Sequence, residues 1–256
     1  MCRLFGLIAN KSVDLRFSML ESAKSFKDLG RKNPDGWGIG WYNQSQEAKV
    51  EKHGENVFYS VGFDELVKEV VSSISIAHVR YASDRKTKGK AKNAHPFLYN
   101  NYIFAHNGTV NKTRLEPLLK PPYNQNYSSD SVDSEIYFRL LIQQISEKGN
   151  LKDGIIDAIK YVIKDDTGAN FVLSDGINLY AYEHGKSLYY LKRDLKKPFS
   201  GQSKETFAFL ESKRASQETA ILVCSEALTD ENWVEFNKNL LIIADKEMNL
   251  EQIEVS

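Results

Sequence analysis

Two amphipathic helical segments followed by a series of short strands most restrict the fold of this sequence. Apolar residues recur at helical spacing over 132–145 and again over 151–163, so each predicted helix carries one apolar stripe. After Gly168 the pattern changes to strand-like segments at 170–174, 178–182, 187–192, 206–210, 219–224 and 240–244. Their hairpin-like spacing favours antiparallel sheets, against which the helical stripes are buried.

The first half of the chain adds further segments of both kinds. The patterns predict strands at 4–9, 36–42, 75–81 and 97–105, and helices at 17–29, 62–72 and 112–119. Strands, then helices, then strands favour an α+β fold in which two sheets pack together under helices. No convincing linker interrupts the chain, so we predict one domain over residues 1–256.

The segment GWGIGWY at 36–42 alternates between large and minimal side chains. Trp37, Ile39 and Trp41 share one face of the predicted strand, and the glycines share the other. A bare strand face is typical of close approach by another backbone or a ligand. The glycine spacing does not match a dinucleotide-binding fingerprint, and no helix follows.

Composition argues against several classes of partner. Lys+Arg and Asp+Glu both number 34, so bulk charge favours neither nucleic acid nor a membrane surface. The two cysteines are too few for a disulfide framework and fit a reducing compartment. The apolar start is too short for a signal peptide or a membrane span, so we expect a cytoplasmic protein.

A cysteine at position 2 is the first candidate for chemistry. Removal of Met1 would leave Cys2 with a thiol and a free α-amine on one residue. That amine has an ordinary pKa of about 7.7–8.0, so it can act as general base for its own thiol. On position alone, a chance cysteine is the simpler interpretation.

Other candidates lie where predicted strands end. Arg80 follows an apolar strand, where a guanidinium suits bidentate capture of a carboxylate or an ordinary ion pair. Asn107 and Gly108 end another strand. The Asn107 amide and the Gly108 N–H suit an oxyanion hole, although Asn-Gly is also a common turn.

Acidic residues gather at the head of the first long helix, in DSVDSE at 130–135. Helix capping explains some of them, and a carboxylate here also suits a substrate ammonium group. The histidines His78, His95 and His106 form no i, i+4 pair and have no carboxylate or cysteine at ligand spacing. We therefore predict no metal site and no cofactor.

Taken in order, six stretches resemble the glutaminase domain of class II glutamine amidotransferases, a group of N-terminal-nucleophile hydrolases. They are MCRLFG, NPDGWGIGWY, AHVRYAS, NAHPF, FAHNG and DSVDSE. The short chain and the NPDGWG form look most like the stand-alone subgroup, with the YafJ-like proteins and the γ-glutamyl amide hydrolases. The resemblance implies a four-layer αββα sandwich of two antiparallel sheets.

The resemblance also implies roles for individual residues. Cys2 is the expected nucleophile, with Asn107 and Gly108 as the oxyanion hole. Arg80 is expected to bind the substrate α-carboxylate, and Asp133 its α-ammonium group. Expected substrate-binding or supporting positions are Arg3, Trp37, Gly38, Tyr81, Ser83 and His95.

Three hypotheses about the activity stay open. The first is cleavage of glutamine or a γ-glutamyl amide, with the ammonia passed to a separate synthase subunit or the product simply released. The second is an N-terminal-cysteine acylase that acts on other amides. The third is a non-catalytic subunit that binds glutamine.

Overall fold

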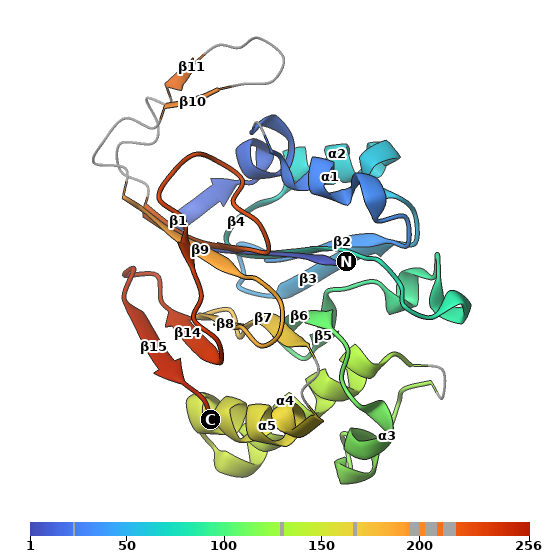
Figure 1. Cartoon of the computed structure of the whole chain (residues 1–256). Helices are drawn as coiled ribbons and strands as arrows, with labels where there is room; N and C mark the ends of the chain where they lie inside the picture. Colours follow the sequence, from blue (N-terminus) through green and yellow to red (C-terminus); the bar gives the residue numbers. More distant parts are fainter. Residues whose placement is uncertain (23, 129–130, 166–167, 195–199, 203–208, 212–218) are drawn as a thin grey trace.

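Two antiparallel sheets lie face to face in the computed structural model, with helices on the outer side of each sheet (Figure 1). The structure describes every residue except 23, 129–130, 166–167, 195–199, 203–208 and 212–218. Within that part of the chain, no helix is long and apolar enough to cross a membrane.

The first sheet has seven strands in the order β13-β9-β12-β1-β4-β2-β3. Its central strand β1 pairs with β4 on one side and with β12 on the other. The strands are β1 (Arg3–Asp14), β2 (Trp37–Tyr42), β3 (Ala48–His53), β4 (Val71–Val79), β9 (Tyr189–Asp194), β12 (Thr219–Cys224) and β13 (Val234–Glu235).

The second sheet has six strands in the order β15-β14-β8-β7-β6-β5. They are β5 (Phe97–Tyr99), β6 (Tyr102–Gly108), β7 (Ala169–Ser174), β8 (Leu179–Tyr182), β14 (Leu240–Ala244) and β15 (Leu250–Glu254). A separate pair, β10 (Ser200–Gln202) and β11 (Phe209–Glu211), extends away from the two sheets (Figure 1).

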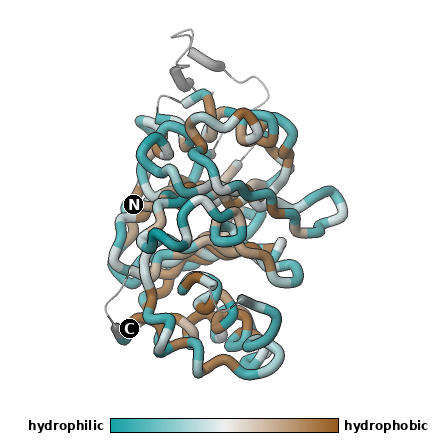
Figure 2. Tube along the Cα trace, turned by 90° about the vertical axis from the view of Figure 1, so that its right-hand side faces the viewer, coloured by the Kyte–Doolittle hydropathy of each residue, from teal (hydrophilic) through white to brown (hydrophobic). Residues whose placement is uncertain are grey.

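Helices form the two outer layers. α1 (Phe26–Leu29) and α2 (Val61–Glu69) lie over the first sheet, and α4 (Asp133–Lys148) and α5 (Leu151–Val162) lie over the second (Figure 1). The short α3 (Lys112–Leu115) contacts α4. Figure 2 shows hydrophobic stretches mostly toward the inside of the trace and hydrophilic stretches along many of the outer turns.

Three hydrophobic clusters match the three interfaces between these layers. Phe5, Trp37 and Phe63 belong to the cluster under α1 and α2. Ile8 and Ile103 belong to the cluster between the sheets, and a third cluster packs the second sheet against α4 and α5. The predicted α+β fold, with two antiparallel sheets between helical layers, is confirmed.

Several predicted boundaries were wrong. The helix expected at 17–29 is a π-helical turn at Phe17–Glu21 and then α1, because the backbone is extended at Ser22 and at Ser25, the N-cap of α1. The strand expected at 97–105 is the hairpin β5–β6, which turns at Asn100 with a φ of +51°. β3, β13 and β15 were not predicted, and residues 206–208 of the strand expected at 206–210 lie outside the described residues.

The glycine face of β2 packs closely against the second sheet, as the alternation of large and minimal side chains predicts. A Cβ built on Gly40 would lie 2.6 Å from Ile103 Cγ2, a side chain of the opposite sheet. A Cβ on Gly38 would lie 2.4 Å from the carbonyl oxygen of His95. The bare face therefore lets the 95–103 segment approach β2 closely, and this approach places His95 beside the site described next.

Candidate functional site

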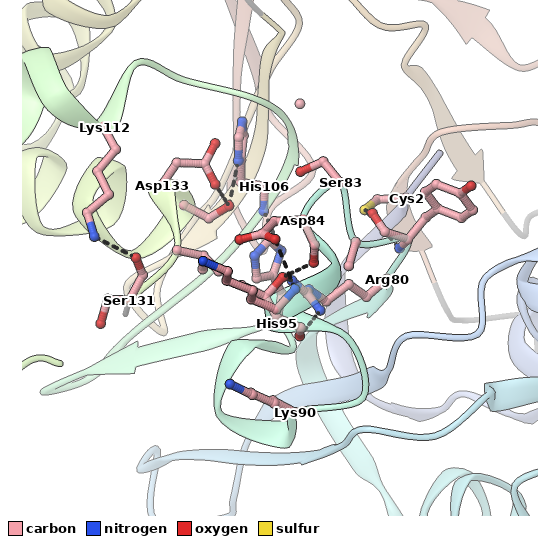
Figure 3. A pocket seen from close by; sticks show the side chains of 17 residues that line it. Cys2, Arg80, Ser83, Asp84, Lys90, His95, His106, Lys112, Ser131 and Asp133 are labelled. Atoms are coloured by element: carbon pink, nitrogen blue, oxygen red, sulfur yellow. Dashed lines mark hydrogen bonds between the residues drawn. The ribbon is translucent and has the colours of Figure 1, made fainter. Parts of the chain in front are cut away.

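The ends of three strands and the start of α4 enclose a cavity of about 510 Å³, which we call the Cys2 cavity (Figure 3). Cys2 precedes β1 and Arg80 follows β4, and the pairing of Arg3 with Val79 brings these two strand ends together. Gly108 ends β6 in the other sheet, and Asp133 is the first residue of α4. The cavity is lined by Cys2, Arg80, Tyr81, Ala82, Ser83, Asp84, Lys86, Thr87, Lys90, His95, His106, Gly108, Lys112, Ser131, Val132, Asp133 and Ser134.

The Cys2 sulfur is held by the backbone of Tyr81. The Tyr81 N–H donates to Cys2 Sγ over 3.2 Å, and the thiol lies 3.5 Å from the Tyr81 carbonyl oxygen. Burial raises the pKa of the Cys2 thiol, and the Tyr81 hydrogen bond and the nearby Arg80 charge oppose that rise. The thiol is therefore protonated at neutral pH and needs a base before it can attack.

Met1 occupies the position beside that sulfur. Its carbonyl oxygen accepts hydrogen bonds from Asn33 Nδ2 over 2.7 Å and from Arg3 Nη1 over 3.0 Å. Asn33 is buried, whereas Met1 is 67% exposed. These two side chains thus hold the carbonyl group of the Met1–Cys2 peptide bond, whose cleavage would free the Cys2 amine.

Arg80 is buried and oriented by a neighbouring loop. Its Nη1 donates to the Thr87 carbonyl and its Nη2 donates to Thr87 Oγ1, both over 2.8 Å. These bonds use two of the five N–H donors of the guanidinium, which leaves others for a ligand. Asp35 fixes the following backbone, since its Oδ2 accepts from the Ala82 N–H over 2.8 Å.

Asp133 lies across the cavity from Arg80 and Cys2 (Figure 3). It does not cap its own helix, because Val132 is the N-cap residue and no side chain caps there. Instead, Asp133 Oδ2 accepts from the Val110 N–H over 2.9 Å, whereas Oδ1 has only a 3.5 Å contact with Ser134 Oγ. One carboxylate oxygen thus remains weakly bonded at the cavity. Asp130, from the same acidic cluster, lies outside the described residues.

Asn107 and Gly108 line a second cavity of about 310 Å³, which we call the side cavity. Cys2, Tyr81, Ser83 and Gly108 line both cavities, so the two meet at the sulfur. A Cβ built on Gly108 would lie 1.9 Å from the carbonyl oxygen of Gly168, so only glycine fits there. The structure thus brings Asn107 and Gly108 to a cavity that Cys2 also lines.

Three buried histidines lie beside one another at the Cys2 cavity, and His95 and His106 are among its lining residues. The ring centroids of His78 and His95 lie 4.2 Å apart, and those of His95 and His106 lie 6.4 Å apart. Burial lowers the pKa of His78 to about 3, that of His95 well below its ordinary value, and that of His106 as well.

The His106 contacts fix its tautomer. Its Nε2 lies 3.1 Å from the Gly168 carbonyl oxygen, so the neutral ring carries its proton there. Its Nδ1 then accepts from Ser134 Oγ over 2.9 Å. Within the described part of the chain, no group of three or more His, Cys, Asp or Glu residues is arranged to hold a metal ion.

Two predicted site residues lie away from both cavities. Trp37 is fully buried among the residues under α2, where its ring stacks on His53 at 4.6 Å and meets the edge of Phe63. Gly38 supports the site only through the close approach of His95. No residue of β2 lines the Cys2 cavity or the side cavity, so Trp37 and Gly38 support the site through packing.

Sequence reasoning missed several lining residues. Lys86, Thr87 and Lys90 belong to the basic run at 85–92, and all three line the Cys2 cavity. Lys112 also lines it and donates to the Ser131 carbonyl over 2.8 Å. A short polar loop has no periodicity, so no sequence signal indicated which of its side chains turn inward.

Comparison with known proteins gives matches along almost the whole chain. Residues 1–254 match the family described as "Glutamine amidotransferases class-II". An uncharacterized protein, MJ1515, from Methanocaldococcus jannaschii is 30% identical over 97% of this chain and 70% of its own length.

Solved structures share the fold. A predicted glutamine amidotransferase from Pseudomonas aeruginosa has a TM-score of 0.66 and 23% identity, over 96% of this chain and 98% of its own. Glutamine phosphoribosylpyrophosphate amidotransferase from B. subtilis has a TM-score of 0.68 and 18% identity, over 100% of this chain but 49% of its own. At these identities the structures support the fold alone.

Proposed function

This chain belongs to the class II glutamine amidotransferases, and we propose that it cleaves the γ-amide of glutamine or of a γ-glutamyl compound through Cys2. In this proposal residues 1–256 act as one catalytic domain. The free thiols of Cys2 and Cys224 fit a reducing compartment such as the cytoplasm.

The observation that carries the proposal is that a positive and a negative side chain both line the cavity that holds Cys2. Arg80 and Asp133 line the same cavity as Cys2. A guanidinium suits an α-carboxylate and a carboxylate suits an α-ammonium group, so together they match an amino-acid head group. Bound in this way, the amino acid directs its side-chain amide toward the sulfur.

The proposed reaction begins after Met1 is removed. The Cys2 α-amine takes the thiol proton, and the sulfur forms a bond to the γ-carbonyl carbon. The resulting alkoxide is stabilised by the Asn107 amide and the Gly108 N–H. When the C–N bond breaks, the protonated amine returns its proton to the leaving nitrogen, and ammonia or an amine departs.

Water completes the turnover. The Cys2 amine takes a proton from water, whose oxygen attacks the γ-glutamyl thioester carbon. The C–S bond breaks, the sulfur takes the proton back, and glutamate is released. No metal ion or cofactor takes part in any of these steps.

Two fates of the leaving nitrogen remain within the proposal. The B. subtilis relative has about twice the length of the aligned region. In the first, a synthase subunit or domain accepts the ammonia. Plain hydrolysis of a γ-glutamyl compound needs no such partner.

The test is release of glutamate from glutamine and from a panel of γ-glutamyl amides, with Cys2→Ala as the blank. An acylase would instead prefer apolar amides that lack the amino-acid head group. A non-catalytic binding subunit would bind glutamine without turnover, and a glutamine-mimicking electrophile would not label Cys2. Either result would replace the proposal with the corresponding alternative.

A further inference from the structure

The space beyond Cys2 is larger than the departure of ammonia requires. The side cavity measures about 310 Å³, and an adjoining outer cavity of about 200 Å³ shares Met1, Asn107 and Lys186 with it. A molecule the size of water or ammonia occupies about 30 Å³. Arg80 and Asp133 line neither of these cavities, so the space belongs to the leaving-group side of Cys2 rather than to the glutamyl head group.

Lys186 is fixed between these two cavities. It lies in the turn from β8 to β9, and Asn170 of β7 holds its backbone. Asn170 Nδ2 donates to the Lys186 carbonyl over 2.6 Å, and the Lys186 N–H donates to Asn170 Oδ1 over 3.2 Å. The side-chain stem crosses Gly168, where a Cβ would lie 3.4 Å from Lys186 Cε. Gly168 in turn contacts Gly108 of the proposed oxyanion hole.

The charge on Lys186 is not matched by the protein. Among the described residues, no carboxylate lies within ion-pair distance of its ammonium group. The other charges that line the outer cavity compensate each other, since Arg3 Nη2 lies 2.5 Å from Glu226 Oε1. Among the described residues, the Lys186 ammonium group therefore adds positive charge to the leaving-group side with no carboxylate beside it, which favours an anion.

We propose that Lys186 selects γ-glutamyl amides whose leaving amine bears a carboxylate, namely γ-glutamyl amino acids and short γ-glutamyl peptides. This inference rests on the proposed function. The glutamyl part occupies the Cys2 cavity, and the departing amino acid extends into the side cavity with its carboxylate at Lys186. Glutamine leaves that space empty and gains nothing from the cation.

Removal of Met1 would also make room for a larger leaving group. Met1 lines both the side cavity and the outer cavity. Its loss frees the Cys2 amine and enlarges the space available to the leaving group in one event.

The experiment compares γ-glutamylglycine with γ-glutamylglycinamide, two probes of nearly equal size that differ in one negative charge. A hydrogen bond to a charged group corresponds to roughly a tenfold effect or more. We expect kcat/KM to favour γ-glutamylglycine by about that factor, and the preference to weaken as salt is added. Lys186→Met keeps the apolar stem and should bring the ratio of the two kcat/KM values, γ-glutamylglycine over γ-glutamylglycinamide, close to one. Lys186→Arg should retain most of the preference.

The matched control is Lys160→Met, because Lys160 is an exposed lysine of α5 that lines none of these cavities. Its ratio should equal that of the unmodified protein. A ratio near one in the unmodified protein, or a ratio unchanged in Lys186→Met, would overturn the role of Lys186. If glutamine and both probes remain uncleaved, the proposed function itself fails, which is a separate outcome.

Discussion

The backbone N–H of Tyr81 donates a hydrogen bond to Cys2 Sγ over 3.2 Å, so the residue that follows Arg80 also positions the sulfur. The same short segment therefore places the proposed nucleophile and the proposed carboxylate-binding group. The orientation of the guanidinium depends in turn on Thr87.

Replacing Thr87 by valine should weaken substrate binding more than it slows chemistry. The change keeps the side-chain shape and removes the Oγ1 acceptor of Arg80 Nη2, while the carbonyl still holds Nη1. A hydrogen bond to a charged group contributes about 1.5–3 kcal/mol, so we expect KM to rise roughly tenfold. Steady-state kinetics measures this, with Thr87→Ser as the control that restores the hydroxyl. A fall in kcat with an unchanged KM would contradict the role.

Two asparagines that face each other in β6 and β7 should behave differently. Asn107→Ala removes a proposed oxyanion donor and should lower kcat by about 10²–10³ with little loss of stability. Asn170 is its register partner, fully buried, and its Oδ1 accepts from the His184 N–H over 2.8 Å.

Asn170→Ala should therefore destabilise the fold by roughly 1–3 kcal/mol, because it leaves buried backbone groups unpaired. Urea unfolding and turnover, measured on both variants, separate the two effects. A stable but nearly inactive Asn107→Ala protein is expected. An Asn107→Ala protein with normal turnover would exclude the oxyanion role.

The buried histidines predict a loss of stability in acid. In the unfolded chain each imidazole takes up a proton near its ordinary pKa of about 6.5. In the folded protein burial keeps the pKa of His78 at about 3, so the unfolded state binds more protons below pH 6.5. The stability is complete above that pH and falls toward pH 3, by at most about 1.4 kcal/mol per pH unit for each such histidine.

His78→Phe should reduce this slope because it removes one buried imidazole. Neither ring nitrogen of His78 has a hydrogen-bond partner among the described residues, so the change breaks no such bond. Urea midpoints at several pH values between 5 and 7 provide the measurement. The same slope with and without His78 would show that this histidine is not kept neutral by burial.

The N-terminal amine should control the pH dependence of turnover. Burial raises the pKa of the Cys2 thiol, so the thiol depends on a base. The proposed base acts only when neutral, and kcat/KM should therefore fall as the pH drops below about 7.7–8.0. Protein that retains a cleavable N-terminal extension should be folded but inactive, and cleavage in front of Cys2 should restore turnover. Activity with the extension in place would rule out the amine as base.

Periodic segments were predicted well because burial on one face leaves a regular pattern. The stripes of α4 and α5 and the bare face of β2 are examples, and each packs as its pattern indicates. The sequence pattern predicted the end of β4 to within two residues. Arg80 could therefore be assigned to the end of a strand.

Features that depend on single contacts were not predictable. Trp37 lies on the face of β2 turned toward α2, and the alternation alone does not say which face meets a ligand. The Thr87 contact with Arg80 and the free charge of Lys186 come from loops without any repeat. Ser22 and Ser25 ended a helical pattern whose apolar spacing was otherwise continuous.

The most direct test is the mass of the Cys2-containing peptide after acid quench during turnover of glutamine. We predict that, after Met1 is removed, this peptide gains one γ-glutamyl group in thioester linkage, and that Cys2→Ala shows neither the adduct nor glutamate release. Normal glutamate release by Cys2→Ala, or a γ-glutamyl group on another residue, would contradict it.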